Sequence, residues 1–266
     1  MSDTEDWLPD LVTWLEVLSR IQLAGYHGLR AEDVHIKDEP GEPSIVTRYD
    51  LESEARLREF VHRRFPTHSF LGEETGNDVR DPGHYWIVDP IDGTSNFADG
   101  IPIWGTSIAY WREGVPELAA ISFPALERTY TARRGGGAWR NGAALHPSRA
   151  PAYSMLTSVG LDSRAHLHQA LHLRTRVRIL GSAIANLCFV ADGTLIASWT
   201  RARLWDVAAG ALILSEVGGV VESAPSLATI DLPTYGRNRV PGVTLIVNAR
   251  AHADLPALGT FLRALT

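Results

Sequence analysis

Cysteine is almost absent from this sequence: Cys188 is the only one among 266 residues, and it lies in the apolar stretch 185–190. A single cysteine cannot form an intramolecular disulfide, and it excludes a cysteine-rich zinc site. The scarcity agrees with a reducing compartment, so we predict a cytoplasmic location. Cys188 itself is interpreted as a small residue of the core.

The chain also lacks an excess of positive charge, a long apolar run and a basic leader. Its formal net charge of −6 argues against a nucleic acid polymer as partner, because such proteins normally carry a basic surface. No apolar run approaches the roughly 18 residues of a membrane span. The acidic residues 1–6 resemble no secretory signal. We therefore expect neither nucleic acid nor membrane as a partner.

The order of the predicted elements indicates the fold class. Apolar periodicity predicts helices at residues 8–21 and 50–64, with Asp50 capping the second. Strands are predicted at 69–71, 85–88, 104–111, 118–123 and 128–132. Later strands (155–159, 177–180, 195–198, 219–222, 243–247) alternate with helices (164–174, 182–190, 206–216, 251–265). We predict an α+β fold with an N-terminal lobe at 1–150 that carries the metal-binding motifs, and an α/β lobe at 151–266. The two lobes are expected to form one catalytic unit.

Acidic residues gather at the ends of predicted strands and the starts of helices, where sites in sheet proteins usually lie. Glu73 and Glu74 follow one strand, Asp89 and Asp92 follow the next, and Asp206 opens a helix. Each of them alone has a simpler interpretation as a turn or cap residue, and Asp206 in particular could serve only as a helix cap.

Repulsion between the carboxylates favours a metal site for these acids as a group. Two carboxylates about 4 Å apart repel by roughly 4 kcal/mol at an effective dielectric constant near 20. No lysine or arginine lies near Asp89 or Asp92 in the sequence to offset this repulsion. Because the candidate ligands are all oxygen atoms, with no paired histidine or cysteine, Mg²⁺ is favoured over Zn²⁺.

The turn after Asp92 predicts an anion site beside the metal. Gly93, Thr94 and Ser95 lead into a short helical segment, so their amide groups can point at an anion. Metal on one side and amide donors on the other would hold a phosphate group.

With these motifs the chain resembles the inositol monophosphatase family. The resemblance is carried by "GEE" at 72–74, "DPIDGTSNF" at 89–97 and "WDVAAG" at 205–210, and it extends to "GGGAWRNG", "ILGSAIANLCFVADG" and "EVGGVV". Members of this family are lithium-sensitive, Mg²⁺-dependent phosphatases. The resemblance implies a layered α-β-α-β-α sandwich of the inositol monophosphatase and fructose-1,6-bisphosphatase type, assembled as a homodimer.

The resemblance also implies roles for individual residues. Glu73, Asp89 and the Ile91 carbonyl would bind one Mg²⁺ ion, and Asp89, Asp92 and Asp206 a second, with two or three ions in total. Thr94, paired with Glu73, would orient and deprotonate the attacking water, so the catalytic residues would be Glu73, Asp89 and Thr94. The implied substrate contacts are Gly93, Thr94, Ser95, Gly181, Ser182 and Asp206.

One position departs from the family pattern and leaves the substrate open. Trp199 stands where inositol-specific members carry an acid that contacts substrate hydroxyls, and Arg201 and Arg203 follow it. We place Trp199 and Arg201 among the substrate contacts, where they would favour a second anionic group or a stacked base. An alternative is that both arginines point to solvent. The candidate substrates are inositol phosphate, a sugar bisphosphate, histidinol phosphate and a 3′-phosphonucleotide. The alternative to an enzyme is a non-catalytic relative that binds a phosphorylated ligand.

Three further signals have simple interpretations. Lys37 could approach the site or be a solvated loop residue. His166, His168 and His172 are interpreted as a solvated helix face, because no other ligands lie nearby. The stretch "RRGGGAWR" at 133–140 is predicted to form a turn between strands.

Overall fold

Two large sheets and the helices packed on them make up most of the fold. A computed structural model of the chain describes residues 7–37, 44–146, 158–161, 176–224, 232–234 and 243–248. Its strands form an eight-stranded sheet, a five-stranded sheet and a small hairpin of β1 (Val34–Lys37) and β2 (Ser44–Thr47). Three short 3-10 helices, η2 (Ala31–Asp33), η3 (Pro124–Leu126) and η5 (Leu232–Thr234), complete the connections that are described.

The eight-stranded sheet is built from the N-terminal half of the chain. Its order is β10 (Ala143–Ala144), β9 (Gly137–Arg140), β8 (Arg128–Arg133), β7 (Val115–Phe123), β6 (Gly105–Arg112), β5 (His84–Asp92), β3 (Ser69–Gly72) and β4 (Gly76–Asp78). All neighbours are antiparallel except β3 and β5, which run parallel. The carboxyl ends of β3 and β5 therefore lie side by side at one edge of the sheet.

The five-stranded sheet comes from the second half. Its order is β12 (Arg176–Ile179), β11 (Ser158–Leu161), β13 (Ala197–Ala202), β15 (Val243–Asn248) and β14 (Val220–Ala224). The strands β12, β11 and β13 are parallel, whereas β15 is antiparallel to both of its neighbours. Every strand of this sheet follows residue 157, and every strand of the larger sheet precedes residue 145. The predicted lobe boundary at 147–151 lies outside the described residues.

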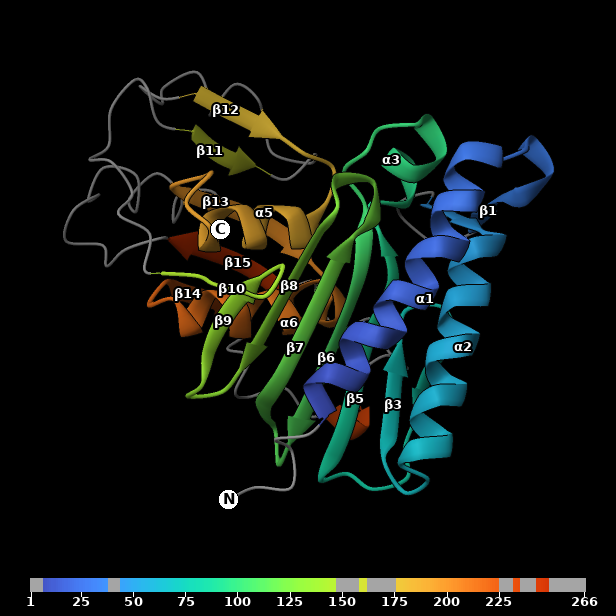
Figure 1. The fold of residues 1–266 in the computed structure, drawn as a ribbon, viewed down its shortest axis with the longest axis horizontal. Coiled ribbons are helices and arrows are strands. Elements are labelled where there is room, and N and C mark those ends of the chain that lie inside the picture. The colour runs from blue at the N-terminus through green and yellow to red at the C-terminus, as the bar shows by residue number, and fades with distance from the viewer. Residues whose placement is uncertain are drawn as a thin grey trace.

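Helices cover both faces of the larger sheet (Figure 1). The helices α1 (Trp7–Gly28) and α2 (Arg48–Arg64) pack on one face, against side chains such as Trp86 and Val88 of β5. The helices α5 (Ala183–Ala191) and α6 (Leu204–Glu216) pack on the opposite face, against Tyr85 and Ile87, and they separate the two sheets. Because β5 is buried on both faces, it reads as a continuous apolar run.

This arrangement confirms the layered fold implied by the resemblance. The described residues supply an α-β-α-β stack. The helices predicted at 164–174 and 251–265, which would form the fifth layer, lie outside the described residues. Among the helices that the structure describes, none is both long and apolar enough to cross a membrane.

Two local expectations were wrong. The cap of α2 is Thr47, whose hydroxyl accepts from the amide of Asp50, while Asp50 is the third helical residue and accepts from the Thr47 amide at 2.8 Å. The strand β5 does not end at Asp89 but continues to Asp92, with a register irregularity between them. By contrast, the turn predicted in "RRGGGAWR" does connect β8 to β9.

Candidate active site

The parallel pair β3 and β5 brings two of the predicted acids together. Gly72 at the end of β3 lies opposite Val88 in β5, and the next residue, Glu73, donates its amide to the Val88 carbonyl at 3.2 Å. Asp89 directly follows Val88, on the face of β5 that α6 covers, and it is only 1% exposed. Glu73 and Asp89 are therefore neighbours because the parallel pairing of β3 with β5 ends at Gly72 and Val88, directly before them.

The first turn of α6 adds a third acid from the other half of the chain. The Trp205 carbonyl accepts a hydrogen bond from the Ser107 hydroxyl of β6 at 3.3 Å, which fixes the start of α6 against the sheet. Asp206 accepts from the Arg203 amide at 2.7 Å, so it is the third helical residue and not the cap. Glu73, Asp89 and Asp206 each offer one oxygen, and these atoms all lie within 4.8 Å of one another.

The three-carboxylate cluster is electrostatically unfavourable without a cation. Burial, followed by repulsion from Glu73 and Asp92, raises the pKa of Asp89 well above its ordinary value. Burial, followed by repulsion from Asp92 and Glu73, likewise raises the pKa of Asp206. Among the described residues, the buried Oδ1 atom of Asp89 has no hydrogen-bond partner. A buried carboxylate with an unpaired oxygen, in a cluster with two other acids, fits the oxygen-only coordination of a hard divalent ion.

Asp92 connects the first half of the chain to helix α5. Its Oδ2 atom accepts hydrogen bonds from the Ser182 hydroxyl and from the Ile184 amide, the latter at 3.0 Å. Ser182 caps α5, so Asp92 lies at the positive end of that helix. Burial raises the pKa of Asp92 to about 6 although these donors oppose the shift. The predicted site residues Asp92 and Ser182 are thus in direct contact.

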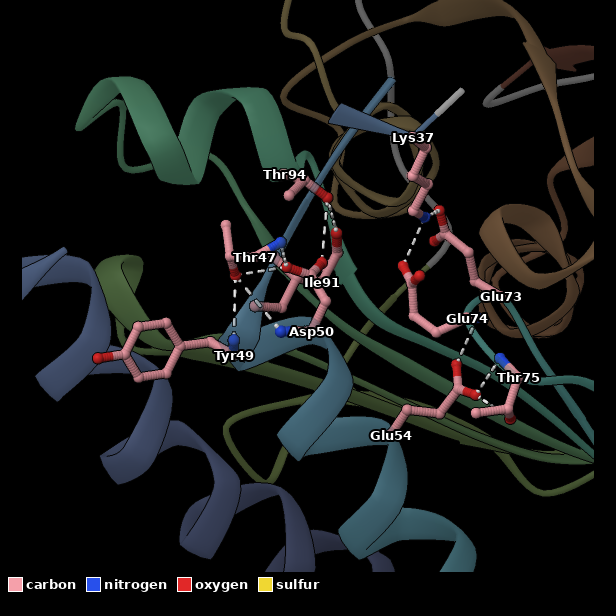
Figure 2. Close-up of polar contacts among 10 residues, drawn as sticks. All are labelled: Lys37, Thr47, Tyr49, Asp50, Glu54, Glu73, Glu74, Thr75, Ile91 and Thr94. Carbon is pink, nitrogen blue, oxygen red and sulfur yellow. Dashed lines mark hydrogen bonds and ion pairs between the residues drawn. The ribbon is translucent and has the colours of Figure 1, made fainter. Parts of the chain in front are cut away.

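Two acceptors other than Glu73 lie within hydrogen-bond distance of the Thr94 hydroxyl. This hydroxyl lies 3.2 Å from Asp50 Oδ1 and 2.9 Å from the Ile91 carbonyl oxygen, and both are acceptors (Figure 2). No hydrogen bond between Thr94 and Glu73 is found among the described residues. Burial raises the pKa of Asp50 to about 6. The threonine therefore pairs with an aspartate that had been interpreted only as a helix cap.

Lys37 does approach the cluster, at the end of β1. Its ammonium group lies 3.1 Å from Glu73 Oε1 and 2.6 Å from Glu74 Oε1, and its side chain is only 16% exposed (Figure 2). Burial alone would lower the pKa of Lys37, but Glu73 and Glu74 together raise it above its ordinary value. Burial and Glu73 raise the pKa of Glu74 to about 8. The interpretation of Lys37 as a solvated loop residue is therefore wrong.

A second carboxylate from α2 fixes the loop that carries Glu73. Glu54 is buried and accepts from the amides of Glu74 and Thr75, each at 2.8 Å. A Cβ atom on Gly72 would lie 2.4 Å from the carboxylate carbon of Glu54. Glycine at the start of the "GEE" motif is therefore required for Glu54 to reach this loop.

The glycine turn after Asp92 has the predicted geometry. Gly93 has a φ of +85° and precedes α3 (Thr94–Asp99), and a Cβ atom there would meet the Ile103 carbonyl oxygen at 2.9 Å. Gly181 lies against the side chain of Asn96, whose amide donates to the Leu180 carbonyl at 2.7 Å. Ser95 is exposed on α3. The segments around Gly93 and Gly181 are therefore adjacent.

The structure describes only some of the residues that were predicted to contact the substrate beyond its phosphate group. Trp199 in β13 is 4% exposed, so it offers no open face on which a base could stack, and that expectation is wrong. It fails because strand β13 is buried on both faces, with Ser198 and Thr200 as inaccessible as Trp199, which the departure from a family motif does not reveal. The side chain of Arg201 and the residues His166, His168 and His172 lie outside the part of the chain that the structure describes. Arg203 precedes α6 as its cap residue.

Sequence reasoning missed Asp50 and Glu54 as site residues. Asp50 follows Thr47 at the spacing of a capping box, and that local signal concealed its contact with Thr94. Glu54 gave one signal: it lies one helical turn after Asp50, on the same face of α2. Both acids are buried, and buried acids on a predicted surface helix point to partners elsewhere in the fold.

Comparisons with known proteins agree with this geometry. A family model described as the inositol monophosphatase family matches residues 15–247. The chain is 38% identical over 194 residues to an inositol-1-monophosphatase of Rhizobium meliloti, covering 67% of this chain and 72% of the relative. It is 35% identical over 212 residues to a histidinol-phosphatase of Mycobacterium tuberculosis, covering 74% of this chain and 81% of the relative.

A solved structure has the same fold over the full length. An IMPase of Thermotoga maritima superimposes with a TM-score of 0.82 at 26% identity, covering 98% of each chain. The family model spans most of the sequence, and both relatives align over most of their own length. The chain therefore belongs to the inositol monophosphatase family.

Proposed function

We propose that the chain is a Mg²⁺-dependent phosphomonoesterase that hydrolyses a small phosphorylated metabolite by direct attack of water. Family membership makes it a phosphoric monoester hydrolase. The observation that carries the metal-dependent mechanism is the convergence of Glu73, Asp89 and Asp206, with the buried Asp89 Oδ1 atom unpaired among the described residues. An acid cluster of this kind needs positive charge to be stable at neutral pH.

The residues that would hold Mg²⁺ are those that the resemblance to the family implies. Glu73, Asp89 and the Ile91 carbonyl would serve one ion, and Asp89, Asp92 and Asp206 a second. Bound there, divalent magnesium supplies positive charge beside the reacting phosphate and makes a neighbouring water more acidic. All of the proposed donors are oxygen atoms, which suits magnesium better than zinc.

The proton of the attacking water would pass through Thr94 to Asp50. A threonine hydroxyl has one hydrogen, so it donates either to Asp50 or to the Ile91 carbonyl. If the Ile91 carbonyl is a ligand, the hydrogen goes to Asp50. The Thr94 oxygen is then free to accept from water, and Asp50 can receive the proton that the hydroxyl releases.

The turn at the start of α3 would bind the phosphate. The amides of Gly93, Thr94 and Ser95 occupy the cap and first turn of α3, where amide groups lack intrahelical partners. Gly181 and Ser182 approach the same region from α5. We therefore propose that both halves of the chain contribute to the substrate site.

The alcohol part of the substrate is proposed to be a small polyol, as in inositol 1-phosphate. One relative is named as an inositol-1-monophosphatase and another as a histidinol-phosphatase, so an amino alcohol phosphate is the second candidate. Because Trp199 is buried, stacking of a nucleotide base on it is not part of the proposal. A non-catalytic role is disfavoured, because the candidate ligands Glu73, Asp89 and Asp206 converge and Thr94 has an acceptor for its proton.

A panel assay tests the proposal. Phosphate release is measured with inositol 1-phosphate, histidinol phosphate, fructose 1,6-bisphosphate and 3′-phosphoadenosine 5′-phosphate, each with Mg²⁺ and with EDTA. We expect release that depends on Mg²⁺, greatest with inositol 1-phosphate. Equal rates in EDTA would refute the metal-dependent mechanism, and tenfold faster hydrolysis of another ester would refute the substrate assignment.

Assembly and lithium sensitivity are proposed from the resemblance to the family. We propose a homodimer, which light scattering on the purified protein measures, and inhibition by millimolar lithium, which the phosphate-release assay measures. The cytoplasmic location is proposed from the single cysteine, Cys188, which is buried. A monomer in solution would contradict the proposed homodimer, and full activity in lithium would contradict the proposed inhibition.

A further inference from the structure

The strand that carries Asp89 and Asp92 contains a bulge. Asp89 pairs with Ser107 of β6, and Asp92 pairs with Gly105, so Pro90 and Ile91 together lie opposite the single residue Thr106. Proline has no amide hydrogen and cannot complete the ladder at this point. A bulge also reorients the residues around it, and bulges are frequent beside active sites.

The bulge leaves the Pro90 carbonyl to be satisfied by side chains. Pro90 is buried in the sheet. Its carbonyl oxygen accepts from the Gln22 amide nitrogen at 3.0 Å and from the Thr106 hydroxyl at 2.8 Å. Gln22 lies on α1 and is fully buried, and Thr106 is 1% exposed. The Gln22 amide nitrogen also lies 2.8 Å from the Thr106 hydroxyl oxygen, so its two hydrogens are shared among the acceptors around it.

A buried glutamine on α1 is otherwise unexpected. The neighbouring inward positions of this helix, Leu11, Leu15 and Leu18, are apolar and belong to the core. Glutamine at such a position is disfavoured unless its amide is hydrogen-bonded. Here the amide also contacts the Ser53 hydroxyl of α2 at 3.1 Å. Its hydrogen bonds therefore join α1, α2 and the bulge in β5.

We propose that Gln22 is a positioning residue for the metal site, and that Thr106 acts with it. The Pro90 carbonyl belongs to the peptide unit that joins Pro90 to Ile91, and this unit lies between two of the proposed ligands, Asp89 and the Ile91 carbonyl. Holding this carbonyl fixes the orientation of that peptide, and so restrains the adjoining peptide that carries the Ile91 carbonyl and the spacing of Asp89 from Asp92. This inference rests on the proposed function, because it assigns Gln22 to the same ion site.

The test measures Mg²⁺ affinity by isothermal titration calorimetry, without substrate. Gln22→Met has nearly the same size but no donor, and Thr106→Val has the same shape without the hydroxyl. Both remove a hydrogen bond to Pro90. Ser53→Ala is the matched control, because it removes a buried hydrogen bond to Gln22 and leaves Pro90 untouched. Circular dichroism and thermal melting in EDTA measure folding and stability for each variant.

We expect Gln22→Met and Thr106→Val to raise the dissociation constant for Mg²⁺ by about tenfold to a hundredfold, the usual effect of losing an outer partner of a metal ligand. Ser53→Ala should stay within threefold of the wild type, even if its melting temperature falls. A purely structural role would lower the melting temperature in EDTA and leave the dissociation constant unchanged.

Three results would overturn the inference. The first is a dissociation constant within threefold of the wild type for both Gln22→Met and Thr106→Val. The second is an equal rise in all three variants, which would indicate general loosening. If Gln22→Met does not fold, the inference is decided by comparing the Mg²⁺ dissociation constant of Thr106→Val with that of Ser53→Ala. The third is a wild-type protein that binds no Mg²⁺, which would refute the proposed function as well.

Discussion

The Thr94 hydroxyl lies 3.2 Å from the carboxylate of Asp50, a residue 44 positions earlier in the chain. Thr94 begins α3, and Asp50 lies in the first turn of α2. The capping bond between Asp50 and Thr47 leaves Oδ1 to face Thr94, because the cap uses Oδ2. One carboxylate thus stabilises a helix with one oxygen and contacts the predicted catalytic hydroxyl with the other.

Replacing Asp50 with asparagine should separate these two tasks. Asp50→Asn retains an oxygen for the Thr47 amide but cannot receive a proton from Thr94. We expect kcat to fall by about a hundredfold or more, a usual contribution of a general base, with a smaller change in KM. Steady-state kinetics with Mg²⁺ measure this, and Asp33→Asn, another buried aspartate, is the control. A variant with a wild-type kcat would exclude Asp50 from proton transfer.

Replacing Asp89 should have opposite effects on activity and on metal-free stability. Asp89→Asn removes one charge from the three-carboxylate cluster of Glu73, Asp89 and Asp206, so the protein should melt at a higher temperature in EDTA. Saturating Mg²⁺ should no longer raise its melting temperature, and phosphate release should fall by about a hundredfold or more. A melting temperature that still rises with Mg²⁺ as in the wild type would contradict the role of Asp89.

Gly72→Ala tests the close approach of Glu54 to the Glu73 loop. The added Cβ would lie 2.4 Å from the Glu54 carboxylate carbon, so this carboxylate must shift away from the Glu74 and Thr75 amides that it holds. We expect a loss of about 1–3 kcal/mol in unfolding free energy and weaker Mg²⁺ binding. Gly28→Ala is the control, because nothing lies within 4 Å of a Cβ there. Equal effects of the two substitutions in denaturant titrations would refute the steric argument.

The lowered pKa of His68 leads us to predict a loss of stability in mild acid. Burial, and then His84, lowers the pKa of His68 to about 4, and the neutral ring accepts from the Trp86 indole at 3.1 Å. Because the unfolded chain has the higher pKa, it binds more protons, and stability falls as pH decreases from about 6.5 toward 4. The loss should be on the order of 2–3 kcal/mol.

Denaturant titrations of the wild type and His68→Phe measure this contribution. Acidic residues also titrate in this range, so the informative quantity is the difference between the two proteins at each pH. We expect the free energy of unfolding of His68→Phe to change less between pH 6.5 and pH 4.5. Parallel pH curves would show that His68 does not take up a proton on unfolding.

The sequence was sufficient to predict the convergence of the acids, because their position at strand ends is a consequence of topology. Glu73 and Asp89 come directly after the parallel-paired segments of β3 and β5, and such segments end at the same edge. Apolar periodicity likewise predicted α1 and α2, since each has a face packed in a core.

Contacts made by residues distant in sequence could not be predicted in this way. The role of Asp50 depends on where α3 meets α2, and the burial of Trp199 depends on packing of the second sheet. Local patterns give the same signal for Asp50 whether or not a partner lies opposite it. The bulge at Pro90 was also hidden, because a proline in a strand indicates a break as readily as a bulge.

The contact between Asp92 and α5 has a thermodynamic consequence. One oxygen of Asp92 holds the first turn of α5 through Ser182 and the Ile184 amide, and the same carboxylate is a proposed ion ligand. Loading of the ion and docking of α5 are then linked equilibria, and linkage is reciprocal. A ligand that favours the docked position of α5 should raise the affinity for the ion. The ion should raise the affinity for that ligand by the same factor. Substrate and magnesium would on this basis bind cooperatively, with the coupling energy carried by a single side chain.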